Sequence, residues 1–129
     1  MKGVLLDTNV ILFASSRSKM LSPKIRRCIE SRPLFLSTIS YWEVVLKTMK
    51  GKLALGDPRR WWSSELADLA AIPLPLAPEH VAAIFELPPL HADPFDRALI
   101  AQATVAGLAL ATTDRQIERY SSRGLQVIS

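Results

Sequence analysis

The chain has 129 residues, 49% of them hydrophobic and 22% charged, and a net charge of +4 at pH 7. This length predicts a single domain over residues 1–129, and the apolar fraction excludes an intrinsically disordered chain. A lone cysteine, Cys28, excludes a disulfide framework and favours the reducing cytoplasm. We expect no membrane segment, because the apolar runs fall far short of the ~18 residues of a spanning helix.

Basic residues are concentrated in the first half of the sequence. Residues 1–62 contain twelve Lys and Arg against four acids, whereas residues 63–129 contain four against eight. Such a basic region is typical of proteins that bind nucleic acid or an acidic protein segment, and an ordinary solvated surface explains it equally well. The charge distribution therefore does not identify a binding partner.

Strand and helix patterns alternate along the chain. Ser22-Pro23 and Pro58 indicate helix starts, and Gly51 and Gly107 indicate helix ends. In chain order we expect a strand at 2–6, helices at 8–15 and 23–31, a strand at 34–37, helices at 39–50 and 58–70, an edge strand at 73–75, helices at 78–87 and 94–106, a strand at 108–111, a helix at 114–121 and a strand at 126–128. This order predicts a three-layer α/β fold, with a mainly parallel central sheet flanked by helices.

Two acids follow predicted strands, where α/β proteins place their functional sites. Asp7 comes directly after the first strand, and Asp114 follows the strand at 108–111. Sites in such folds form outside the carboxyl ends of the strands. Each acid also precedes a helix, where aspartate commonly caps the N-terminus, so position alone leaves both roles open.

Two further acids stand at the start of one predicted helix. Asp93 precedes Pro94 and is placed as the helix cap, whereas Asp96 lies three and four residues before Leu99 and Ile100. That spacing puts Asp96 on the apolar stripe of its own helix. An inward carboxylate costs several kcal/mol unless a partner compensates it, so Asp96 favours a functional role.

Glu43 lies at the rim of the apolar stripe of its predicted helix. Lys47 lies one turn later and could form an ordinary surface ion pair with Glu43. Taken alone, Glu43 therefore fits this ion pair and a functional role equally well.

The four carboxylates Asp7, Glu43, Asp96 and Asp114 make a stronger case together. Acids gathered at one edge of a sheet repel one another, and proton uptake or a cation must relieve that repulsion. Hard oxygen ligands favour Mg²⁺ or Mn²⁺, which activate water and stabilise charge at a phosphodiester. With the basic first half, the group predicts a metal-dependent nuclease.

Four segments, in order, carry a resemblance to a known family. They read LLDTNV at 5–10, SYWEV at 40–44 followed by GKL at 51–53, LPPLHADPFDRALIAQA at 87–103, and ATTD at 111–114. With these segments the sequence resembles PIN-domain proteins, and in particular VapC-type toxin ribonucleases of type II toxin–antitoxin pairs. The resemblance covers nearly the whole chain.

The resemblance implies a Mg²⁺- or Mn²⁺-dependent endoribonuclease whose acidic quartet falls on Asp7, Glu43, Asp96 and Asp114. Asp93 belongs to the extended motif, where it would bind metal, orient water or cap the helix. The resemblance also implies an RNA substrate, a homodimer, and inhibition by a cognate VapB-type antitoxin whose tail lies along the toxin groove.

Other polar residues lie near these segments. Thr8, Asn9 and Thr112 match positions that help to hold carboxylates and water in the family. We expect His91 to be polar surface outside the site, and Arg97 to contact phosphate or to form a surface ion pair. The residues that we expect to contact the RNA backbone are Lys47, Lys50 and Lys52.

Three other kinds of protein deserve comparison. A haloacid dehalogenase-type phosphatase needs a second Asp where this chain has Asn9, and a receiver domain needs a phospho-accepting Asp that residues 72–77 do not supply. A module that keeps the fold and binds RNA or a partner without cleaving RNA is the alternative function.

Overall fold

The computed structural model describes residues 2–129, except for the side chains of residues 122 and 123. Five strands form one sheet in the order β3-β2-β1-β4-β5, and every neighbouring pair is parallel. The strands are β1 (Val4–Leu6), β2 (Leu34–Ser37), β3 (Ile72–Leu74), β4 (Ala109–Ala111) and β5 (Val127–Ile128). The expected α/β fold with a parallel sheet is confirmed.

Helices connect the strands. They are α1 (Thr8–Ser16), α2 (Pro23–Ser31), α3 (Thr38–Met49), α4 (Pro58–Asp68), α5 (Pro78–Ile84) and α6 (Pro94–Ala106), with short 3-10 helices η1 (Ser18–Met20) and η2 (Ile117–Arg123). Side chains of Ser22, Asp57 and Asp93 cap α2, α4 and α6, each of which has proline in its first turn. None of the helices in residues 2–129 is long and apolar enough to cross a membrane.

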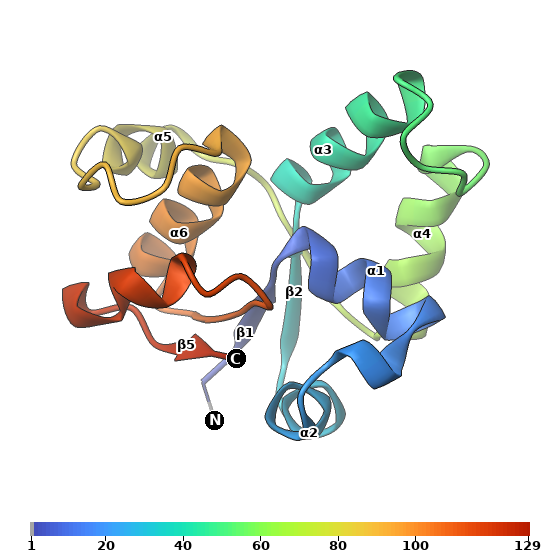
Figure 1. Cartoon of the computed structure of the whole chain (residues 1–129), viewed down its shortest axis with the longest axis horizontal. Helices are drawn as coiled ribbons and strands as arrows, with labels where there is room; N and C mark the ends of the chain where they lie inside the picture. Colours follow the sequence, from blue (N-terminus) through green and yellow to red (C-terminus); the bar gives the residue numbers. More distant parts are fainter. Residues whose placement is uncertain (1) are drawn as a thin grey trace.

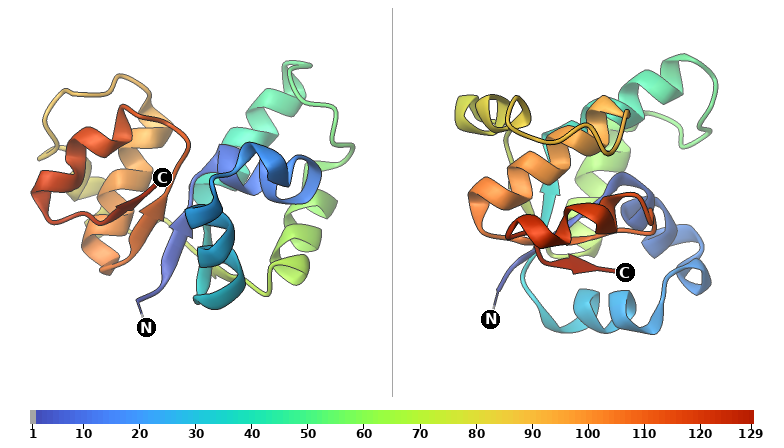
Figure 2. Two further views of the ribbon diagram at one scale, coloured as in Figure 1. Left: turned by 60° about the horizontal axis from the view of Figure 1, so that its bottom comes forward. Right: turned by 60° about the vertical axis from the view of Figure 1, so that its left-hand side comes forward.

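The sheet separates two hydrophobic cores because successive strand residues point to opposite faces. Val4 and Leu6 pack in one core with residues of α1, α2 and α4, whereas Leu5 packs in the other with residues of α6 and η2. Figure 1 shows this layering, with α5 and α6 on one side of β1 and β2 and with α1, α2 and α4 on the other. In the left view of Figure 2 the same two groups of helices again lie on opposite sides of the strands.

Two expected helices differ from the structure: the helix expected at 78–87 already ends at Ile84, and the helix expected at 114–121 is of another kind. Residues 114–121 were expected to be helical, but the helical segment is the 3-10 helix η2, which covers Ile117–Arg123. The Asp114 side chain accepts a hydrogen bond from the Gln116 amide at 2.8 Å. The backbone amides of Ile117 and Arg119 each donate to the carbonyl three residues earlier. These local bonds form tight turns in place of an α-helix, and Gly124 ends the segment with a φ of 83°.

The Leu5→Ala variant tests the core that supports the site. Leu5 is 0% exposed in the strand that leads directly to Asp7. Its truncation should lower the free energy of unfolding by about 2–5 kcal/mol, because it removes buried methyl groups and leaves a cavity. Urea unfolding measures this. Leu55→Ala, at a position 38% exposed, should cost less than about 1 kcal/mol, and equal losses at the two positions would contradict the assignment of the core.

Candidate functional site

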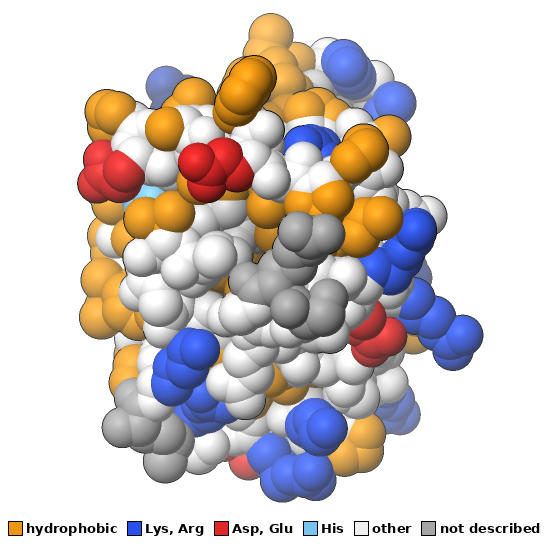
Figure 3. Space-filling model, turned by 90° about the vertical axis from the view of Figure 1, so that its left-hand side faces the viewer, with side chains coloured by type: hydrophobic (Ala, Val, Ile, Leu, Met, Phe, Trp, Pro, Cys, Tyr) orange, Lys and Arg blue, Asp and Glu red, His pale blue; other side chains and the backbone are white. Residues whose placement is uncertain are grey.

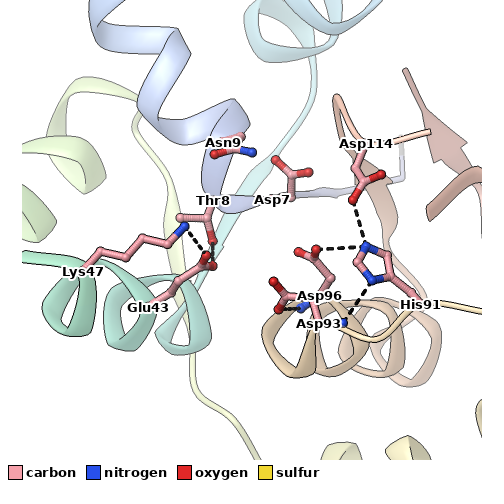
Figure 4. Close-up of a pocket in the computed structure, with 9 residues that line it drawn as sticks. All are labelled: Asp7, Thr8, Asn9, Glu43, Lys47, His91, Asp93, Asp96 and Asp114. Carbon is pink, nitrogen blue, oxygen red and sulfur yellow. Dashed lines mark hydrogen bonds and ion pairs between the residues drawn. The ribbon is translucent and has the colours of Figure 1, made fainter. Parts of the chain in front are cut away.

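A pocket of about 250 Å³ lies where β1 and β4 end (Figure 4). All four acids of the predicted quartet line it, and Asp93 does so as well. Of the lining residues, five are acids and one is a lysine; they are Asp7, Thr8, Asn9, Glu43, Lys47, His91, Asp93, Asp96 and Asp114. The structure therefore brings together side chains from four separate parts of the sequence.

Asp7 joins β1 to α1, and its side chain is buried. Oδ1 accepts a hydrogen bond from the Val10 amide at 2.8 Å, so Asp7 caps α1. Oδ2 accepts a hydrogen bond from the hydroxyl of Thr112, which itself accepts from the Asp114 amide at 2.9 Å. Thr112 thus links the ends of two neighbouring strands and fixes the positions of Asp7 and Asp114. Asp7 is both a helix cap and a pocket residue.

The first turn of α6 carries Asp93 and Asp96. Asp93 is the N-cap, because its Oδ1 accepts hydrogen bonds from the amides of Phe95 at 2.8 Å and Asp96 at 3.3 Å. The Asp96 side chain is 21% exposed and turns into the pocket, as the apolar stripe of its helix predicts. The cap orients the helix that presents Asp96.

Glu43 enters the pocket from α3 and is 7% exposed. Its Oε1 accepts a hydrogen bond from the Thr8 hydroxyl at 2.7 Å, and its Oε2 lies 2.8 Å from Nζ of Lys47. The helical ion pair with Lys47 therefore forms, but it forms inside the pocket. On α3 and α6, the rings of Trp42 and Phe95 meet edge to face at 5.1 Å, which joins the two helices.

Burial raises the pKa of two of these carboxyls. Loss of hydration is the largest cause in both, and the pKa of Asp7 rises to about 6 and that of Asp96 to about 7. Hydrogen bonds from Thr112 and Val10 oppose the rise at Asp7, whereas the Asp93 charge adds to the rise at Asp96. Burial, and to a smaller extent the neighbouring acids, thus disfavour the charged forms of Asp7 and Asp96 in this pocket.

The arrangement can hold a divalent cation. Donor atoms of His91, Asp96 and Asp114 lie within 4.8 Å of one another, and Asp7 and Glu43 face the same pocket. Carboxylate oxygens are the ligands that Mg²⁺ and Mn²⁺ prefer, and a bound cation would stabilise the charged form of these buried carboxyls. The donor set of the pocket therefore fits such an ion.

The sequence interpretation of His91 is wrong. Its side chain is only 9% exposed, and Nε2 lies 2.8 Å from Asp114 Oδ2 and 3.1 Å from Asp96 Oδ2. The position of His91 two residues before Asp93, inside the same motif, is the one sequence feature that indicated a place in the site. Arg97 also differs from expectation, because its guanidinium donates to backbone carbonyls of the loop before α6, among them those of Pro88 and Leu87 at 3.0 and 3.2 Å.

We expect the metal-free protein to lose stability as the pH rises from about 4.5 to 7.5. The folded state keeps protons on Asp7 and Asp96 up to pH about 6 and 7, whereas the unfolded chain releases them near pH 4. Because the folded state binds more protons across this window, the free energy of unfolding falls as pH rises.

Thermal unfolding in EDTA at constant ionic strength measures this pH dependence. Asp96→Asn should reduce the loss between pH 5 and 7.5 by about 1–2 kcal/mol. Glu30→Gln, at an exposed position on α2, should leave the loss unchanged. A stability that is flat or rises over this range would contradict the raised pKa values.

Comparisons with known proteins agree with the fold. DNA-bound VapBC from Salmonella typhimurium is 19% identical with a TM-score of 0.68, over 98% of this chain and 97% of the other. VapBC2 from Rickettsia felis bound to a promoter DNA fragment is 14% identical with a TM-score of 0.69, over 98% and 99%. FitAcB from Neisseria gonorrhoeae is 20% identical with a TM-score of 0.64, over 98% and 96%.

The TM-scores, over nearly the whole chain, show a shared fold and, at these low identities, the fold alone. No curated protein sequence matches the chain. The PIN domain family, however, matches residues 4–122, which include every lining residue of the pocket. The chain therefore belongs to the PIN domain family.

Proposed function

We propose that this chain is a VapC-type toxin, a metal-dependent endoribonuclease that acts in the cytoplasm as a single PIN domain. The observation that carries the proposal is the meeting of Asp7, Glu43, Asp96 and Asp114 in one pocket at the carboxyl end of the sheet. Membership of the PIN domain family supports a nuclease function for such a pocket.

In this proposal the four acids hold Mg²⁺ or Mn²⁺. When bound, such an ion would supply an activated water and stabilise negative charge on a scissile phosphate. Asp93 uses Oδ1 as the cap of α6, so it would add at most its other oxygen to this set. Thr8 and Thr112 orient the acids, because their hydroxyls donate to Glu43 and Asp7.

The basic residues near α3 would contact the RNA backbone. Lys47 lines the pocket, and Lys50 and Lys52 are exposed just beyond the C-terminal end of α3. Phosphate contacts of this kind position a nucleic acid without reading its sequence. Residues 1–62 carry most of the Lys and Arg of the chain, which agrees with a polyanionic substrate.

Protein partners are also part of the proposal. We expect a cognate VapB-type antitoxin, because the structural neighbours include VapBC and FitAcB, and we expect a homodimer from the resemblance to VapC-type toxins. Exposed hydrophobic side chains support protein contacts: Val81 of α5 is 51% exposed, Phe85 directly after α5 is 94% exposed, and Trp42 of α3 is 55% exposed. Figure 3 shows hydrophobic side chains gathered in the upper part of one face, at the height of α5 in Figure 1.

Metal-dependent cutting of RNA tests the enzyme directly. Purified protein free of antitoxin is incubated with tRNA, rRNA fragments and mRNA in Mg²⁺, Mn²⁺ or EDTA, and the products are resolved on a denaturing gel. The wild type should give discrete fragments with either metal and none in EDTA. Asp96→Asn should cut at least about 100-fold more slowly, since losing a ligand removes several kcal/mol of transition-state stabilisation.

Asp93→Asn is the matched control for this experiment. Asparagine caps helices as well as aspartate does, so this variant should keep the fold and most of the cutting. Equal loss in the two variants would place Asp93 among the metal ligands. RNA binding without cutting in the wild type, with metal present, would contradict the enzyme and favour a catalytically silent binding module.

A further inference from the structure

The imidazole of His91 reaches the acids from the loop between α5 and α6 (Figure 4). Nε2 contacts one carboxylate oxygen of Asp96 and one of Asp114, which belong to α6 and to the turn after β4. In Figure 4 the ring lies on the opposite side of the pocket from Glu43 and Lys47. A single nitrogen therefore joins two acids that lie apart in the sequence.

The second ring nitrogen indicates where the proton of the ring lies. The Asp93 amide donates a hydrogen bond to Nδ1 at 3.1 Å, so Nδ1 presents its lone pair. The ring proton is then on Nε2, and Nε2–H donates to Asp114 Oδ2 at 2.8 Å, while Asp96 Oδ2 lies 3.1 Å from the same nitrogen. A metal bond to Nε2 would need the opposite tautomer, with an Nδ1 proton directed at the Asp93 amide.

The loop that presents His91 is held independently of these contacts. The Tyr120 hydroxyl donates to the Pro88 carbonyl at 2.9 Å and accepts from the Leu90 amide at 3.2 Å. The Arg97 guanidinium donates, over 3.0 to 3.4 Å, to the carbonyls of Ile84, Leu87, Pro88 and His91. Because these bonds involve the loop backbone, a change of the His91 side chain should leave the loop in place.

We infer that His91 is a positioning residue of the acidic site and not a metal ligand: its Nε2–H bridges Asp96 and Asp114 and holds their carboxylates close enough to share one cation. The inference rests on the function proposed above. The donor atoms of the three side chains lie within 4.8 Å of one another. Ligands of one octahedral Mg²⁺ or Mn²⁺ ion, with bonds of ~2.1 Å, lie ~3–4 Å apart. Without the bridge, the two like charges would separate.

Two matched variants separate the bridge from the rest of the side chain. In His91→Asn the side-chain oxygen takes the place of Nδ1 and can accept from the Asp93 amide, but the side chain is too short to donate to both acids. In His91→Gln the longer amide can still donate. Isothermal titration of Mn²⁺ at pH 7.5 should give a Kd about 10–100-fold higher for His91→Asn and a Kd within about 3-fold of wild type for His91→Gln.

The ring itself provides a second measurement. The chain has two histidines, so His91→Gln assigns the imidazole signals in ¹⁵N–¹H correlation spectra. The Nε2–H tautomer should be present both in the metal-free protein and with Mg²⁺ bound. A switch to Nδ1–H on addition of Mg²⁺, with Mn²⁺ binding lost in both variants, would make His91 a ligand and overturn the inference.

Asp96→Asn separates failure of this inference from failure of the proposed function. If Asp96→Asn loses Mn²⁺ binding and His91→Asn keeps it at wild-type affinity, the inference about His91 is overturned and the proposed function stands. Tighter binding by His91→Asn would also overturn it, because His91 would then compete with the cation. Absence of Mn²⁺ binding in the wild type would overturn the proposed function and this inference with it.

Discussion

The mutual repulsion of carboxylates in one half-closed pocket is the constraint on which the rest of the structure depends. Asp7 and Glu43 are buried, and Asp96 is largely so. Short polar contacts offset part of the free energy that is lost when these carboxylates are buried together. The Thr112 hydroxyl donates to Asp7, and Thr8 and Lys47 contact Glu43. The pKa values of Asp7 and Asp96 remain raised, first because burial removes hydration and then because neighbouring acids repel the charge. A site of this kind stores electrostatic free energy that a cation can release.

The sheet topology makes this gathering possible. β1 and β4 are neighbours although more than one hundred residues separate their sequences, so the turns that follow them place Asp7 and Asp114 side by side. Helices α3 and α6 then bring Glu43 and Asp96 to the same edge. Strand β1 contributes to both hydrophobic cores, since Leu6 packs on one face of the sheet and Leu5 on the other. The site therefore depends on the packing of the whole sheet.

The parts of this arrangement that depend on local pattern were predictable from the sequence. Asp7 and Asp114 follow from the ends of strands, and Asp96 follows from the stripe of a helix whose bounds agree with α6. The two interpretations of Glu43 turn out to be compatible, because its ion pair with Lys47 is made inside the pocket. His91 was missed because its place depends on Tyr120 and Arg97, and contacts across the fold leave no periodic pattern in the sequence. The 3-10 helix η2 was missed because side-chain bonds at Asp114 override helix propensity.

The central claim is that the acidic pocket binds one or more divalent cations through its carboxylates. A crystal grown with Mn²⁺ and measured at a wavelength where manganese scatters anomalously tests this directly. The account predicts an anomalous peak about 2.2 Å from carboxylate oxygens of Asp96 and Asp114, with Nε2 of His91 hydrogen-bonded to them and outside bonding distance of the ion. A peak bonded to Nε2, or manganese bound only elsewhere on the molecule, would contradict it.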